Sequence, residues 1–131
     1  MKIDYDFLKK LLLTMEENDA HTISNSALAE SVGLDLNKID DALFDKFVGH
    51  LRLLQDNECI DSKSLTLGFS QGANGHWLIQ HAQYRLTNRG YEFIDLLKEK
   101  GVFSKIKNLS LSMAFDVGKA VLVNLATGAV K

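Results

Sequence analysis

Apolar residues recur at helical spacing in three successive stretches of the first 57 residues, and this pattern constrains the fold more than any other feature. In the first stretch, Leu8, Leu11 and Met15 lie on one face of a helix expected over residues 3–17. Asp4 is its expected N-cap, because a carboxylate there accepts hydrogen bonds from the free N–H groups of the first turn. The chain therefore begins with an amphipathic helix whose apolar face must be covered.

The next two helices are joined by a short turn. The second is expected over residues 27–32, after the capping cluster Ser24-Asn25-Ser26 and before Gly33. The third is expected from a cap at Asn37 to about Asp56. Its apolar stripe consists of Ile39, Leu43, Phe47, Leu51 and Leu54. Two helices with a glycine-containing turn between them indicate a helix-turn-helix.

The periodicity changes after the third helix. Leu65, Leu67 and Phe69 alternate with polar residues, which predicts a half-buried strand. The dipeptide Asn74-Gly75 is typical of a tight hairpin turn, since both residues tolerate positive φ angles. The returning strand is marked by Leu78, Ala82, Tyr84 and Leu86.

A fourth helix is expected from a cap at Thr87 or Asn88 to about Gly101. Its apolar stripe consists of Tyr91, Phe93, Ile94 and Leu97. The expected fold is mainly α with a small antiparallel hairpin: a winged helix-turn-helix over residues 1–101, followed by a C-terminal helical extension over residues 102–131. The extension is expected either to pack on the domain or to mediate homodimerisation, because a terminal amphipathic helix can pair with its twin.

Charge is distributed unevenly along the chain. The 131 residues carry a formal net charge of −2, but residues 1–57 carry −5 and residues 58–131 carry +3. Such an asymmetry concerns partners rather than fold. The absence of a long apolar stretch argues against a membrane span, and the single cysteine, Cys59, fits a reducing cytoplasm.

Acidic residues gather on the helix that a DNA-binding protein of this type would place in the major groove. Asp40, Asp41 and Asp45 lie near the start of the third helix. Affinity for duplex DNA comes largely from lysine and arginine, and residues 64–84 of the wing contain neither. DNA binding through this surface is disfavoured, so the three aspartates are a candidate partner-binding face, with a simple solvated helix face as the alternative.

Basic residues gather instead in the second half of the chain. The candidate basic patch consists of Arg85, Arg89, Lys98, Lys105 and Lys107. It could bind nucleic acid or an acidic protein, or form a solvated helix surface with internal ion pairs.

The sequence contains no pattern typical of catalysis. His76 and His81 are five residues apart in an expected strand and therefore face opposite sides. No histidine or cysteine pair has zinc spacing, and Gly72 and Gly75 lie in a hairpin rather than a phosphate loop. We expect no enzyme activity, no metal and no cofactor.

Several segments resemble a phage- and prophage-associated family known only as a domain of unknown function. The similarity rests on the start MKIDYDFLKKLLL (residues 1–13, pattern MK-x-D-x-D), on HLRLL (residues 50–54) and on RLTNRGYEFID (residues 85–95, pattern R-L-T-x-x-G-x-E-F-[LI]-D). The segment VFSKIK (residues 102–107) also matches in pattern. The resemblance covers about residues 1–107 and implies a winged-helix-like fold and a mobile-element origin, but no catalytic or binding residues.

The chain departs from the family pattern at three positions. Glu58 stands where the family usually has a glycine after the third helix, so Asn57 is expected to take the left-handed position. Asn88 and Tyr91 replace a usual tryptophan and a usual histidine.

Together these features predict a non-catalytic module that binds a host or phage protein and regulates or inhibits a host system. The alternative is a DNA-binding transcriptional regulator of the same fold.

Overall fold

The structure, a computed structural model, describes residues 1–38 and 41–127. In chain order its elements are α1 (Tyr5–Glu17), β1 (Ile23–Ser24), α2 (Asn25–Ser31), α3 (Asp41–Asp56), β2 (Ile60–Ser62), β3 (Phe69–Gln71), β4 (Trp77–Ile79), β5 (Gln83–Leu86), α4 (Asn88–Lys98), α5 (Lys100–Ile106) and α6 (Leu111–Thr127). The chain is mainly helical with short antiparallel strands, as the sequence predicts.

The strands form two small sheets. In the first, β5 lies between β1 and β2 and is antiparallel to both, with Ile23 opposite Tyr84 and Asp61 opposite Arg85. In the second, β3 and β4 form an antiparallel hairpin with Ser70 opposite Leu78. In the sequence, the hairpin therefore lies between β2 and β5, which are paired neighbours in the first sheet.

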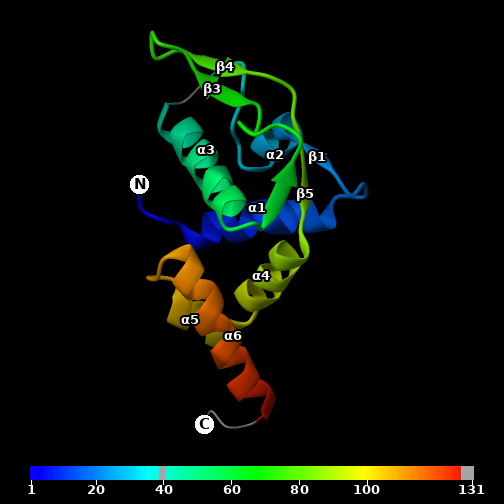
Figure 1. Cartoon of the computed structure of the whole chain (residues 1–131), viewed down its shortest axis with the longest axis vertical. Helices are drawn as coiled ribbons and strands as arrows, with labels where there is room; N and C mark the ends of the chain where they lie inside the picture. The colour runs from blue at the N-terminus through cyan, green and yellow to red at the C-terminus, as the bar shows by residue number, and fades with distance from the viewer. Residues whose placement is uncertain (39–40, 128–131) are drawn as a thin grey trace.

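The molecule is elongated (Figure 1). The β3–β4 hairpin lies at one end, beside the start of α3, and α6 points away from it at the other end. Helix α1 crosses the middle and contacts α2, α4 and β5. Leu11, Phe47 and Phe93, from α1, α3 and α4, are fully buried in one continuous cluster. These apolar stripes thus meet as their spacing predicts.

The predicted N-caps of three helices are confirmed. Asp4 Oδ1 accepts a hydrogen bond from the N–H of Phe7 at 3.1 Å, and Ser24 Oγ accepts one from Ala27 at 3.1 Å. At α4 the cap is Thr87, whose Oγ1 accepts from the N–H of Gly90. Helix α2 ends as predicted before Gly33, which has a φ of 78°.

The predicted strand at residues 65–69 is wrong for most of its length. Residues 65–68 form a turn, and Leu65 is 89% exposed. The predicted returning strand is also two strands, β4 and β5, which belong to different sheets.

The buried side chain of Asn25 explains this interruption. Its Nδ2 donates to the carbonyl of Gln80 at 2.8 Å, its Oδ1 accepts from the N–H of Ala82 at 3.5 Å, and its own N–H donates to the Ala82 carbonyl at 2.9 Å. Asn25 therefore forms hydrogen bonds with the backbone groups of Gln80 and Ala82, which would pair with a neighbouring strand if β4 and β5 were continuous.

Four smaller predictions are also wrong. Asn37 lies in a turn, with its N–H on Asp35 Oδ1, and not at a helix N-cap. Helix α4 ends at Lys98, so Gly101 lies inside α5. Tyr91, predicted to face the core, is 47% exposed because its side chain lies on the outer face of α4.

The fourth concerns the end of α3. The residue with a left-handed backbone there is Glu58, with a φ of 60°, and not Asn57. The N–H of Cys59 bonds the Leu54 carbonyl and the N–H of Glu58 bonds the Gln55 carbonyl, which is the pattern of a Schellman motif. In this pairing the left-handed position falls on Glu58.

Helices α5 and α6 pack against α4. Their residues Val102, Ile106, Leu111 and Phe115 are buried in the same cluster as the core of the rest of the chain. The division of the chain at residues 101 and 102 stays a prediction.

Candidate functional site

The N-terminal strap, which we define as residues Met1–Asp4, lies against the outer face of α3. A Cβ added to Gly49 would come within 2.5 Å of Met1 Sδ, so the strap touches α3 where that helix has no side chain. The N–H of Asp4 donates a hydrogen bond to His50 Nε2 at 2.9 Å. The strap therefore covers part of α3 next to Asp45.

The two basic residues of α3, Lys46 and Arg52, contact other parts of the protein. Lys46 Nζ forms an ion pair with Asp4 Oδ2 at 2.7 Å and lies 4.8 Å from the centroid of the Phe7 ring. The hydrogen bond from Lys46 is the main reason that the pKa of the Asp4 carboxyl is lowered. The Arg52 guanidinium lies 5.7 Å from the centroid of the Trp77 ring.

Of the three aspartates predicted to form an acidic face, Asp45 is exposed near the start of α3. Asp40 and the side chain of Asp41 lie outside the described residues. Asp6 and Asp35 are also exposed, from α1 and from the turn before α3. The described carboxylates in this region are therefore on the surface.

The hairpin adds apolar side chains to this end of the molecule. Trp77 packs edge-on against Phe44 of α3 with ring centroids 5.1 Å apart, and Phe44 packs in the same way against Phe69 at 5.5 Å. Leu78, between Trp77 and Ile79, points the other way and is 60% exposed. Sequence reasoning placed Leu65 and Leu78 in half-buried strands and so missed them as surface residues.

The members of the candidate basic patch lie on β5, at both ends of α4, and in and just after α5. Arg85 on β5 forms an ion pair with Asp61 on β2 at 3.1 Å, and Arg89 at the start of α4 lies over the ring of Phe115. Lys98 pairs with Glu16 at 2.8 Å, an interaction that raises the lysine's pKa. Lys105 and Lys107 are exposed at the end of α5 and just after it.

Two members of the candidate basic patch, Lys98 and Lys107, also belong to a lysine cluster that the tertiary fold brings together. Lys9 of α1 joins Lys98, Lys100 and Lys107 around a hollow of about 330 Å³ beside Phe103. Nothing in the sequence near Lys9 indicates this neighbourhood, because α1 and α5 are almost a hundred residues apart.

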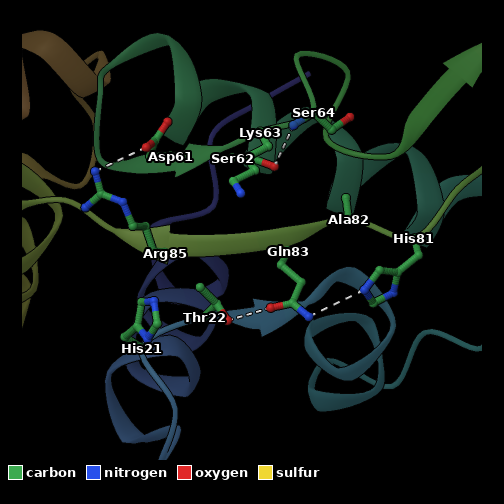
Figure 2. Close-up of a pocket in the computed structure, with 10 residues that line it drawn as sticks. All are labelled: His21, Thr22, Asp61, Ser62, Lys63, Ser64, His81, Ala82, Gln83 and Arg85. Atoms are coloured by element: carbon green, nitrogen blue, oxygen red, sulfur yellow. Dashed lines mark hydrogen bonds and ion pairs between the residues drawn. The ribbon is translucent and has the colours of Figure 1, made fainter.

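The open face of the first sheet carries a wider hollow, of about 690 Å³, between β1, β2 and β5. Figure 2 shows Arg85 turned toward Asp61 at one end of it. Thr22 Oγ1 donates to Gln83 Oε1 at 2.5 Å, and Gln83 Nε2 lies 3.5 Å from Nε2 of His81. The polar groups of this hollow thus largely bond one another.

Cys59 and His50 are two buried residues with nucleophilic or acid–base side chains. Cys59 is buried, and burial raises the pKa of its thiol to about 11. Both ring nitrogens of buried His50 already have backbone partners. Within residues 1–38 and 41–127, no group of three histidine, cysteine, aspartate or glutamate side chains is arranged to hold a metal.

A family model described as a hypothetical protein, DUF2513, matches residues 2–115. The chain belongs to the DUF2513 family. The match includes α1 to α5 and the first residues of α6, so the candidate surface on α3 and the hairpin lies within the DUF2513 region. Most of α6 lies beyond it. Searches of curated proteins and of solved structures each found no match.

The described part of this DUF2513 chain contains no helix that is both long and apolar enough to cross a membrane.

Proposed function

We propose that this DUF2513 chain is a winged-helix module that acts by binding another protein. The order of elements supports this fold: α1, β1, α2 and α3 are followed by β2, a protruding hairpin and β5, with β5 in the middle of the sheet. In such a module α3 corresponds to the recognition helix and the β3–β4 hairpin to the wing.

The observation that carries the proposal is that both cations of α3 contact other parts of the protein. Lys46 is paired with Asp4, and Arg52 lies over Trp77, whereas Asp45 is exposed. A helix that enters a DNA groove needs free cations directed at phosphates. The described charges of this surface instead favour a partner with basic groups.

The hairpin supports the same conclusion. Residues 64–84 contain no charged side chain, and Leu65 and Leu78 expose apolar surface there. Exposed apolar side chains can take part in contacts between proteins. We define the docking surface as the exposed residues Asp45, Leu65 and Leu78, which come from α3, the turn before β3, and β4.

The biological role that we propose is regulation or inhibition of a host system by a non-catalytic phage or prophage protein in the cytoplasm. The family resemblance of residues 1–13 and 85–95 supports the origin, and the high thiol pKa of Cys59 together with the paired nitrogens of His50 supports a role without catalysis.

The test begins with capture of host proteins on the immobilised full chain, followed by titration of each purified candidate. Asp45→Lys and Leu78→Asp should each weaken binding about tenfold or more, because charge complementarity and apolar contact are lost. Asp19→Lys is the matched control, since Asp19 is an exposed acid in the loop after α1. If Asp45→Lys, Leu78→Asp and Asp19→Lys all bound the partner with equal affinity, the proposal that the partner binds the docking surface would be contradicted.

DNA binding is the second candidate function, and the cluster of Lys9, Lys98, Lys100 and Lys107 favours it. We expect no salt-dependent binding when mixed-sequence duplexes are titrated by anisotropy between about 50 and 200 mM salt. Binding that weakens with salt, and weakens further in Lys9→Ala or Lys107→Ala, would support a DNA-binding regulator instead.

A further inference from the structure

We propose that His50 is a pH-sensitive latch for the N-terminal strap: when Nε2 of His50 is protonated, the strap leaves α3 and uncovers the helix face beneath it. The latch itself is a property of the free chain. Its role as a regulator of partner binding rests on the proposed function, because the uncovered face adjoins Asp45 of the docking surface.

The hydrogen bonds of His50 define its protonation state. The side chain is fully buried, Nδ1 lies 2.7 Å from the carbonyl oxygen of Lys46, and Nε2 lies 2.9 Å from the backbone nitrogen of Asp4. A carbonyl can only accept and a backbone N–H can only donate. The ring is therefore neutral, with its hydrogen on Nδ1 and a free lone pair on Nε2 directed at Asp4.

Protonation removes the acceptor that holds the strap. A hydrogen on Nε2 would face the N–H of Asp4, so two donors would meet where one hydrogen bond had been. The new charge would also be buried one helical turn from the ammonium group of Lys46. The latch can therefore not remain closed in its present geometry when His50 is charged.

The charged groups that act on His50 come from α3 and from the strap. Lys46 disfavours the imidazolium and Asp4 favours it, while α1 contributes the uncharged ring of Phe7, edge-on with centroids 5.1 Å apart. Burial is the largest influence, and the pKa of His50 is lowered from its ordinary value of 6.5. At neutral pH His50 is therefore uncharged, and its Nε2 can accept the hydrogen bond that holds the strap closed.

The strap has further contacts besides the hydrogen bond to His50. Ile3 is half-buried and packs against the hydrophobic core, and Asp4 Oδ1 caps α1 at the N–H of Phe7. The Asp4–Lys46 pair is more than one-third exposed on both sides, and such pairs contribute about 0–1 kcal/mol. Met1 is 66% exposed although its sulfur lies against Gly49. The hydrogen bond to His50 is the contact between the strap and α3 that protonation of His50 removes.

The sign of the pH dependence follows from the two states. In the closed strap the pKa of His50 is lowered, and release of the strap opens Nε2 to water and so moves the pKa back toward its ordinary value of 6.5. As the pH falls below 6.5, the released state takes up the proton first. The ratio of released to closed strap should rise as the pH falls between the two pKa values, by at most tenfold per pH unit.

The experiment is amide hydrogen exchange of the full chain between about pH 7.5 and 5.5, corrected for intrinsic exchange rates. In the wild type the protection of the Asp4 amide should fall as the pH is lowered below 6.5, by at most tenfold per unit, while the Leu12 amide in the core of α1 stays protected. In His50→Gln the amide oxygen can still accept from Asp4 but does not titrate, so protection of Asp4 should not change with pH.

The proposal would be overturned by constant protection of the Asp4 amide in the wild type, by simultaneous loss at Leu12, or by wild-type behaviour in His50→Gln. If His50→Gln does not fold, NMR titration of the wild-type imidazole decides: its proton uptake must coincide with the change at Asp4. None of these measurements uses a partner. Failure of the latch and failure of the docking surface are therefore separate results.

Discussion

The guanidinium carbon of Arg89 lies 3.8 Å from the centroid of the Phe115 ring, and this contact joins the start of α4 to α6. Phe115 is only 3% exposed and Arg89 is half-buried, so the cation lies over an aromatic face that is shielded from water. Cation–π contacts of this kind contribute about 0.5–2 kcal/mol, with the higher values in desolvated sites. Arg89, assigned from sequence to a basic patch, thus has a contact within the fold.

We expect Arg89→Gln to lower the free energy of unfolding by about 1 kcal/mol, measured by urea denaturation. Arg85→Gln is the matched control: its ion pair with Asp61 has side chains that are 50% and 56% exposed, and exposed pairs contribute about 0–1 kcal/mol. Equal losses in the two variants would show that the ring contact contributes nothing beyond the charge.

Local features of the fold could be predicted from the sequence. The caps Asp4, Ser24 and Thr87 each act on an N–H group three residues away, so the short-range pattern contains the whole interaction. The apolar stripes of α1 and α4 were predictable for the same reason, since burial follows the 3.6-residue period. Tyr91 is the exception, because an aromatic residue at the edge of a stripe can lie outside it.

Features that depend on distant contacts could not be predicted. Asn25 reads as one of three capping residues, but its side chain bonds the backbone of residues 80 and 82 and so separates β4 from β5. The same holds for the strap, where Asp4 was predicted as a cap and also pairs with Lys46 and bonds His50. Each depends on which segments the tertiary fold brings together.

Replacement of Glu58 by glycine should stabilise the protein. Glu58 has a left-handed backbone with a φ of 60° at the end of α3, where a side chain costs roughly 1–2 kcal/mol and glycine costs almost nothing. Because glycine also gains freedom in the unfolded chain, the expected net gain is about 0.5–1 kcal/mol in the free energy of unfolding. Glu58→Ala should give no such gain, since alanine keeps the Cβ.

A comparison of two neighbouring residues on β4 tests the attachment of the hairpin. Trp77→Ala should lower the free energy of unfolding by about 2–3 kcal/mol, because the Trp77 ring packs against Phe44 and under Arg52. Leu78→Ala should change it by less than about 0.5 kcal/mol, because Leu78 is 60% exposed. Chemical denaturation measures both, and a larger loss for Leu78→Ala would contradict the orientation of the strand.

The contribution of the Asp4–Lys46 pair to stability should disappear in acid. The pKa of Asp4 is lowered below its ordinary value of 3.8, mainly by the hydrogen bond from Lys46, so the folded state binds its proton less readily than the unfolded state. The stabilisation is therefore fully present above pH 3.8 and is lost as the pH falls through the lowered pKa. Asp4→Asn removes the charge but keeps an oxygen that can cap α1.

At pH 7, Asp4→Asn should lower the free energy of unfolding by up to about 1 kcal/mol, because the pair is partly exposed. Asp4→Ala should cost about 1 kcal/mol more, since the cap on Phe7 is lost as well. Urea denaturation at pH 7, 5 and 3 is carried out in a His50→Gln background, where the strap does not respond to titration of His50; the difference between this parent and its Asp4→Asn variant should be the same at pH 7 and 5 and should shrink near pH 3. A difference that persisted in full at pH 3 would mean that the charge of Asp4 is not its source.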